Sequence, residues 1–338
     1  MTKVLPPIPL RFLAAILAVA AAGAVLAQGP RPARVHTATE ARPVHLLPAS
    51  ETPPGGNRVE ILERGAHREV RANGIPSHPV GPFPNRANPN RITAQDHDFM
   101  IPSNPKSARH ITPGRQAGGP FGIALNGVLF EPGTAEFWKG DRTSGWNYEA
   151  LGGAVTLGLD ANHAHVQPTG NYHYHGLPTL LMKRLGYREG EHSPQIGWAA
   201  DGFPIYARYG YRDPDDPASG VIALRGSYRL RTGQRPGGEE PGGPYDGAFV
   251  QDYEYVAGLG DLDECNGRFC LTPEFPEGTY AYFLTENWPV IPRYFRGTPT
   301  TLRAPGAGIP PGGGRVKGPH KGPPKGRGGP KGFQGPPR

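Results

Sequence analysis

The chain has few cysteines, few methionines and only one long apolar run, and each shortage excludes a class of protein. Its 338 residues include two cysteines and three methionines. Two cysteines cannot hold a domain of this size together, so a disulfide-stabilised scaffold is excluded and the core must be hydrophobic. The apolar run, residues 12–26, is too short and too rich in alanine to predict a membrane span, with an uncleaved anchor as the alternative.

Several catalytic signatures are also absent. The chain has no Gly-x-Ser-x-Gly nucleophile elbow, no phosphate-binding glycine loop, no Rossmann fingerprint and no His-Glu-x-x-His zinc motif. These absences argue against serine hydrolases of the elbow type, nucleotide-binding enzymes and the common zinc proteases. Any catalytic chemistry must therefore come from a less familiar arrangement of side chains.

The first 27 residues have the three parts of a secretory signal. Lys3 and Arg11 supply positive charge around the start of the apolar run, and residues 25–27 form a small-residue cleavage site ahead of Gln28. We therefore expect a signal peptide over residues 1–27. The mature protein is predicted to be secreted or periplasmic, with no transmembrane span after cleavage.

Basic charge is concentrated at the end of the chain. The formal net charge is +7, but eight of the 36 Lys and Arg lie at or beyond Arg303 and two lie in the signal. The 29 acids all lie between residues 28 and 302, where the remaining 26 bases oppose them. This body is mildly acidic, which argues against a specific nucleic-acid surface.

The segments on either side of the body lack an apolar period. Residues 28–56 are rich in Pro, Arg and Ala and are predicted to be a disordered linker. Residues 303–338 are predicted to be a disordered basic tail of Gly, Pro and Lys. The tail could bind an anionic polymer or surface by charge alone, or it could be an inert solubilising extension.

Residues 57–302 predict a mostly β domain. Short apolar and aromatic segments recur at intervals of roughly eight to twenty residues between long Gly/Pro loops, as in antiparallel sheets that form a sandwich or a barrel-like fold. At most one or two short helices are expected. The best candidate is 179–185, which Gly186 would end.

The segment 162–176 contains two His-x-His pairs on either side of a turn signal. Side chains alternate between faces along a strand, so both histidines of a pair project to the same side. Pro168 and Gly170 fit a three-residue hairpin loop whose register places the pairs opposite each other. The histidines expected on one face are His163, His165, His173 and His175, while Ala164, Val166, Tyr172 and Tyr174 would form core on the other.

Histidines that share one face of a hairpin can bind a transition metal. Opposed Cβ atoms on paired strands are about 5 Å apart, which lets two or three imidazoles converge on one ion. Neutral imidazole suits a divalent transition metal, and we favour Zn or Cu without deciding between them. The alternative is a solvent-facing strip that is merely rich in histidine.

Acids and cysteines elsewhere could contribute to a site. Asp201, in an Asp-Gly turn before an aromatic strand, could be a catalytic base or an additional ligand, or simply a turn residue. Asp263 and Glu264 are weaker candidates in an acidic loop. Cys265 and Cys270 are predicted to form an intramolecular disulfide, with a pair of thiolate ligands as the alternative.

The tetrapeptide at residues 172–175, in the context Pro-Thr-Gly-Asn-Tyr-His-Tyr-His-Gly, resembles the YHYH-domain family of secreted proteins, which is named for it. Further stretches similar to the family lie at residues 73–78, 121–127, 201–206 and 277–285. The resemblance covers about residues 57–300. It implies a domain name, but the family carries no settled activity or ligand.

Two functions of different class follow from these observations. The first is a secreted or periplasmic metal-dependent enzyme, a hydrolase or an oxidase, that uses the hairpin histidines as ligands on an unknown substrate. The second is a non-catalytic metal-binding or cell-surface binding module. Three ligands that face a cleft would favour the first, and a closed shell of four ligands would favour the second.

Overall fold

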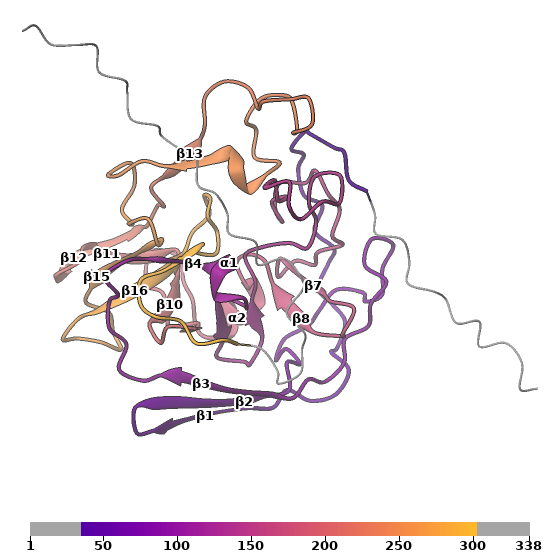
Figure 1. The fold of residues 1–338 in the computed structure, drawn as a ribbon. Coiled ribbons are helices and arrows are strands. Elements are labelled where there is room, and N and C mark those ends of the chain that lie inside the picture. Colours follow the sequence, from indigo (N-terminus) through magenta and orange to yellow (C-terminus); the bar gives the residue numbers. More distant parts are fainter. Residues whose placement is uncertain (1–34, 303–338) are drawn as a thin grey trace, which may run out of the picture. The chain divides into compact units, whose positions relative to one another are not determined.

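The structure, a computed structural model, describes residues 35–302 and is mostly β with two short helices (Figure 1), which confirms the predicted fold class. The predicted signal peptide and the predicted basic tail lie outside the described residues. Within the described part, no helix has both the length and the apolar character needed to cross a membrane.

A small antiparallel sheet forms the first part of the domain. Its strands, in spatial order, are β1 (Val59–Arg64), β2 (His67–Ala72) and β3 (His97–Pro102). β2 alternates between exposed and buried positions, and Val70 pairs with Phe99 of β3 with both side chains buried. On the same inward face, the Arg68 guanidinium lies 3.4 Å from the centre of the Trp198 ring.

An eight-stranded mixed sheet forms the centre. Its strands, in spatial order, are β15 (Gly267–Cys270), β16 (Thr279–Leu284), β10 (Pro204–Ala207), β9 (Gly197–Ala199), β5 (Gly122–Ala124), β6 (Leu129–Phe130), β8 (Tyr172–Tyr174) and β7 (Ala164–Val166). The pairs β10/β16 and β6/β8 are parallel and the others are antiparallel. The described sheet is open, with β15 and β7 as its edges, and so is not a closed barrel.

Three two-stranded sheets and the helices complete the described part. The strand pairs are β11 (Tyr209–Asp213) with β12 (Asp216–Ala223), β13 (Tyr228–Leu230) with β14 (Tyr253–Tyr255), and β4 (Thr112–Pro113) with β17 (Tyr294–Phe295). The helices are α1 (Gly114–Ala117), α2 (Thr179–Arg184) and the 3-10 turn η1 (Val250–Asp252).

Helix α2 agrees with the predicted helix to within one residue. It begins after Pro178. In its first turn, the Leu180 N–H donates a hydrogen bond to Asn162 Oδ1 over 3.0 Å. Gly186, at φ 84°, follows its end as expected for a C-terminal stop. The contact with Asn162 ties this helix to the start of the histidine-rich segment.

One hydrophobic core joins the small sheet to the central sheet. Val70 and Phe99 belong to the same buried cluster as Ile123, Tyr174 and Ile205. Each such side chain stabilises the fold by about 1.5–3 kcal/mol relative to leaving it exposed. The face of β8 that carries Tyr174 is therefore fixed by packing, which in turn fixes the opposite face.

Residues 35–56 differ from the predicted disordered linker. The Leu47 N–H donates to the Leu159 carbonyl over 2.9 Å, Glu51 exchanges backbone hydrogen bonds with Val80, and Leu46 packs against a second buried cluster. Few apolar residues suffice to hold this segment in place, because carbonyl and N–H groups in loops of the domain form hydrogen bonds with its backbone.

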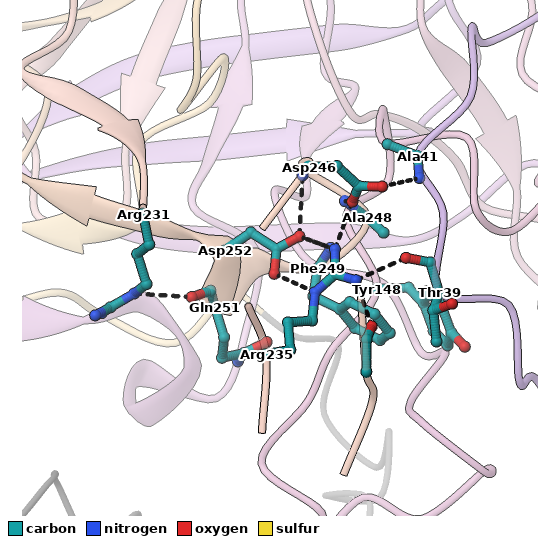
Figure 2. Close-up of polar contacts among 12 residues, drawn as sticks. Thr39, Ala41, Tyr148, Arg231, Arg235, Asp246, Ala248, Phe249, Gln251 and Asp252 are labelled. Atoms are coloured by element: carbon teal, nitrogen blue, oxygen red, sulfur yellow. Dashed lines mark hydrogen bonds and ion pairs between the residues drawn. The ribbon is translucent and has the colours of Figure 1, made fainter. Parts of the chain in front are cut away.

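A buried arginine also holds this segment (Figure 2). The Arg235 side chain is fully buried, and its guanidinium donates to Asp252 and to Asp246 and, over 2.7 Å, to the Thr39 carbonyl. Asp246 accepts in turn from the Ala41 N–H over 2.9 Å. Buried charges persist in folded proteins when they are paired in this way.

Candidate metal centre

The histidine-rich hairpin has the predicted register. His165 of β7 pairs with His173 of β8, and the loop closes with the Gln167 N–H donating to the Asn171 carbonyl. Gly170 has φ 85°, the left-handed conformation expected of the residue that closes a three-residue loop. The sequence pattern around Pro168 therefore sets which side chains meet.

Three of the four predicted histidines converge, and His165, His173 and His175 are called the triad below. The Nε2 atoms of His173 and His175 lie 3.0 Å apart, and those of His175 and His165 lie 3.1 Å apart. Nitrogens bound to one tetrahedral Zn²⁺ at about 2.0–2.1 Å would be roughly 3.3 Å from each other. Two of the three separations are therefore close to the spacing that a single ion requires, and the ligand atoms of all three histidines lie within 4.8 Å of one another.

Hydrogen bonds on the far side of the rings fix which nitrogen carries the proton. His165 Nδ1 lies 3.0 Å from the Leu157 carbonyl, and His173 Nδ1 lies 3.2 Å from the Asn171 carbonyl. A carbonyl can only accept, so each Nδ1 donates its hydrogen. In the neutral ring, Nε2 then presents a lone pair to the other imidazoles, which is the tautomer that binds a metal.

Burial keeps these imidazoles neutral. It lowers the pKa of His173 to about 4. Burial, followed by the proximity of His173, lowers the pKa of His165 to about 3. The pKa of His175 is well below its ordinary value, again through burial first and then through the other two rings. Neutral imidazole is the form that coordinates metal ions.

Glu131 lies at the side of the triad. It follows β6, its N–H donates to the Tyr174 carbonyl over 2.9 Å, and its Oε2 lies 4.0 Å from His173 Nε2. The Gln167 side chain donates to the same Oε2 over 2.8 Å. The Glu131 side chain is 23% exposed, whereas His173 and His175 are buried, so the carboxylate is more accessible to solvent than these two rings.

The opposite face of β8 carries a second polar network. The Tyr172 hydroxyl donates to Asp160 over 2.8 Å, and Tyr174 lies 2.7 Å from His78 Nε2 and accepts from the Asn126 amide over 2.9 Å. Both tyrosines are fully buried, as predicted. The alternating tetrapeptide therefore directs its histidines to the triad and its tyrosines to the core.

His163 does not join the triad, although the backbone register that includes it is the predicted one. Its carbonyl accepts from the His175 N–H over 2.7 Å, but its own φ is 53° and its Nδ1 contacts the Leu177 carbonyl at 2.9 Å. β7 begins at Ala164, so strict alternation does not apply to the residue before it. The four candidate ligands expected on one face thus become three.

Asp201 lies apart from the triad. It is in the turn between β9 and β10. Two strands, β5 and β6, lie between β9 and β8 in the sheet, so β9 and β8 are about 14 Å apart at ordinary strand spacing. It accepts from the Tyr282 hydroxyl over 2.5 Å and from the Gly297 N–H over 2.8 Å. Burial raises its pKa to about 6. These contacts fit a structural role.

Cys265 and Cys270 are free thiols in the structure, in contrast to the predicted disulfide. They pack into different buried clusters, and the extended strand β15 carries Cys270 away from Cys265. Disulfide-bonded Cα atoms lie within about 7 Å of each other, and the extended course of β15 works against so short a distance. Asp263 accepts from the Tyr280 hydroxyl and from backbone N–H groups of the turn, with no part in the triad.

Sequence reasoning missed Glu131. Its signal is faint, because it is only an acid that directly follows two apolar strand residues, Leu129 and Phe130. What brings it to the triad is the parallel pairing of β6 with β8, two strands that are far apart in the sequence. Nothing in the local pattern specifies that pairing.

The comparisons with known proteins give one finding. The family model described as "YHYH protein" matches residues 98–297, which is more than half of the chain and includes the hairpin and Glu131. Neither the curated proteins nor the solved structures gave a significant match. The resemblance seen in the tetrapeptide is thereby confirmed over the central sheet, and the chain belongs to the YHYH protein family.

Proposed function

We propose that the protein binds one divalent transition metal ion through the Nε2 atoms of His165, His173 and His175. The observation that carries this proposal is the convergence of three Nε2 atoms while at least two of the rings donate Nδ1–H to carbonyls. The His175 ring has no hydrogen bond at Nδ1 among the described residues, so its hydrogen can lie on Nε2, but it could then donate to only one of the two neighbouring Nε2 atoms. A metal ion would accept the lone pairs of all three rings at once, and burial disfavours protonation of the rings as an alternative.

Zn and Cu are the favoured ions. Three imidazole nitrogens without a thiolate suit Zn, Cu, Fe and Ni, while Mg and Ca prefer oxygen ligands. Zn in catalytic sites typically has three protein ligands and one open position. A triad of histidines beside one partly exposed carboxylate fits that pattern.

A catalytic role is supported by Glu131. A bound Zn²⁺ would lower the pKa of a water molecule and polarise an oxygen of the substrate. Glu131 is close enough to the triad to accept a proton there, and Gln167 orients it. We therefore favour a metal-dependent hydrolase. If the same three ligands bind copper, a redox ion, the corresponding function is an oxidase.

A non-catalytic metal-binding or cell-surface module is the alternative function. It would be favoured if Glu131 closed the coordination shell as a fourth ligand, since a closed shell leaves no position for a substrate. In either case we propose a secreted or periplasmic location, which rests on the signal-like residues 1–27.

The test is metal analysis of the mature protein. Protein purified without added metal is expected to contain about one Zn or Cu ion per chain, measured by elemental analysis. After chelation and dialysis, calorimetry is expected to detect one site for that ion. His173→Ala with His175→Ala should abolish binding, and His192→Ala serves as the control, because His192 lies in contact with Tyr206 and Tyr211 outside the triad. Unchanged stoichiometry in the double variant would refute the proposal.

A further inference from the structure

Two arginines lie on one buried phenyl ring. The guanidinium of Arg115, in α1, is 4.8 Å from the centre of the Phe137 ring, and that of Arg142 is 5.4 Å from it. Both arginines are exposed, while Phe137 is only 3% exposed. Cation–π contacts of this kind restrict where each guanidinium can lie.

Neither guanidinium has a partner of opposite charge among the residues that the structure describes. Within residues 35–302 the two side chains make no ion pair and no side-chain hydrogen bond. The chain outside that range contains no Asp or Glu that could supply one. By contrast Arg68, Arg235 and Arg293 also lie over aromatic rings, and each of these three has a carboxylate partner.

Arg293 connects the unpaired arginines to the metal centre. Its guanidinium donates to the carbonyl of Pro132, the residue after Glu131, and its own carbonyl accepts from the Gly114 N–H over 2.8 Å, next to Arg115. The segment 131–137 therefore runs from the carboxylate beside the triad to the ring under the arginines.

We propose that Arg115 and Arg142 form a subsite for an oxyanion carried by the substrate, such as a phosphate, sulfate or carboxylate group. Arginine favours such groups, because its planar fork of N–H donors matches two oxygens at once. An anion between the two guanidiniums would offset the repulsion between them. This subsite rests on the proposed function, which places the reacting bond of the substrate at the triad. It adds that the substrate is an anion.

The binding of small anions tests the subsite without knowledge of the substrate. Inorganic phosphate, sulfate and acetate are titrated separately into the full mature chain, as purified and again after metal removal, and binding is measured by calorimetry. Arg115→Gln with Arg142→Gln is expected to weaken the best of these anions about tenfold or more in both preparations. Preference for phosphate or sulfate over acetate would assign the substrate to esters of those acids, and the reverse preference to carboxylates.

Arg212→Gln is the matched control. Arg212 is an exposed arginine of β11 for which the structure gives no ion pair, and this variant keeps the basic tail, so any binding of anions to the tail is common to both proteins. Arg115→Lys with Arg142→Lys keeps the charge and loses the fork, and it should recover only part of the affinity. Circular dichroism establishes that each variant is folded.

Two outcomes would overturn the subsite. One is equal anion affinity in the double Gln variant and in Arg212→Gln, and the other is no anion binding by the wild-type protein. Metal content is measured in the same samples. It should not change in the double variant, so a failure of the subsite can be told from a failure of the metal site.

Discussion

His173 Nε2 and His175 Nε2 lie 3.0 Å apart, although His173 lies in β8 and His175 directly follows the end of that strand. Side chains at alternate positions of a strand start about 6.5–7 Å apart, so both rings lean toward a common point. His165, from the paired strand, reaches the same point. A hairpin of two short strands thus brings three ring nitrogens together, with Glu131 Oε2 4.0 Å from that of His173.

Removal of His165 should affect metal binding far more than removal of His163. His165→Ala deletes one of three converging nitrogens, and we expect the metal affinity to fall by about a hundredfold or more. Loss of a group that only hydrogen-bonds to a metal ligand already lowers metal affinity by about 10–100-fold. His163→Ala should change it less than about threefold. Competition with a chromophoric chelator measures both. Equal losses would show that His163 is a ligand after all.

Glu131→Gln should retain one ion per chain and bind it about tenfold less tightly, because the variant removes a negative charge close to the ion. Glu277→Gln, an exposed acid on the far edge of the sheet, is the control and should have no effect. X-ray absorption at the metal edge distinguishes the two functions. A coordination number that falls by one in Glu131→Gln would identify Glu131 as a ligand and favour the closed, non-catalytic site.

Metal binding should survive in mild acid. An ordinary imidazole takes up a proton near pH 6.5, but burial places the pKa of His173 at about 4 and that of His165 at about 3. Protons therefore compete for the nitrogens only below about pH 4–5. Calorimetry at pH 7, 6 and 5 should give similar affinities once buffer effects are removed, and a tenfold loss between pH 7 and 6 would contradict this expectation.

The metal-free protein should lose stability as the pH falls below about 6.5. The unfolded chain protonates these histidines there, while the folded chain keeps them neutral until about pH 4, so the unfolded state binds more protons across that window. The urea midpoint at pH 7 and at pH 5 measures the effect. The difference between the midpoints at the two pH values should be smaller in the double variant His165→Ala with His173→Ala. This comparison distinguishes the contribution of the triad from that of the other buried histidines.

Loss of Asp252 should destabilise the domain strongly. Asp252→Ala leaves the fully buried Arg235 guanidinium with Asp246 alone, and breaking a buried pair in this way costs about 3–5 kcal/mol. Glu254→Ala removes the partner of Arg229 at the surface and should cost less than about 1 kcal/mol. Denaturant unfolding of both variants gives the comparison. Similar costs would mean that the N-terminal segment is held by other contacts.

Both cysteines should be free and unreactive in the native protein. Burial raises the pKa of the Cys265 and Cys270 thiols, and the thiolate is the form that reacts. Alkylation followed by mass spectrometry should label neither under native conditions and both in denaturant. A chain lighter by two hydrogen atoms and resistant to labelling in denaturant would restore the predicted disulfide.

Local patterns predicted the hairpin well. The loop residues Pro168 and Gly170 and the alternation of His with apolar or aromatic residues determine the register, and both act over fewer than fifteen residues. Helix α2 was predictable for the same reason. The strand β7 begins only at Ala164, so the alternation does not extend to His163, and its side chain takes another direction than the pattern predicted.

Features that depend on distant pairing could not be predicted. Glu131 reaches the triad because β6 pairs in parallel with β8, and Asp201 is kept from it by the strand order of the central sheet. Both facts belong to the topology, which periodicity does not encode. The ordered course of residues 35–56 depends likewise on hydrogen bonds to residues far along the chain, such as Arg235.

All three nitrogens come from eleven consecutive residues, and this has a consequence for the order of events as the newly made chain folds. A ring of that size closes within about 10–100 ns, well before a mixed sheet can form, so a metal ion can be captured by the nascent hairpin. The carbonyl of Leu157, which holds His165 in its binding tautomer, and the carboxylate of Glu131 arrive only with the folded sheet. Early capture would therefore be weak and exchangeable, and the ion would be locked in, and selected, by the completion of folding.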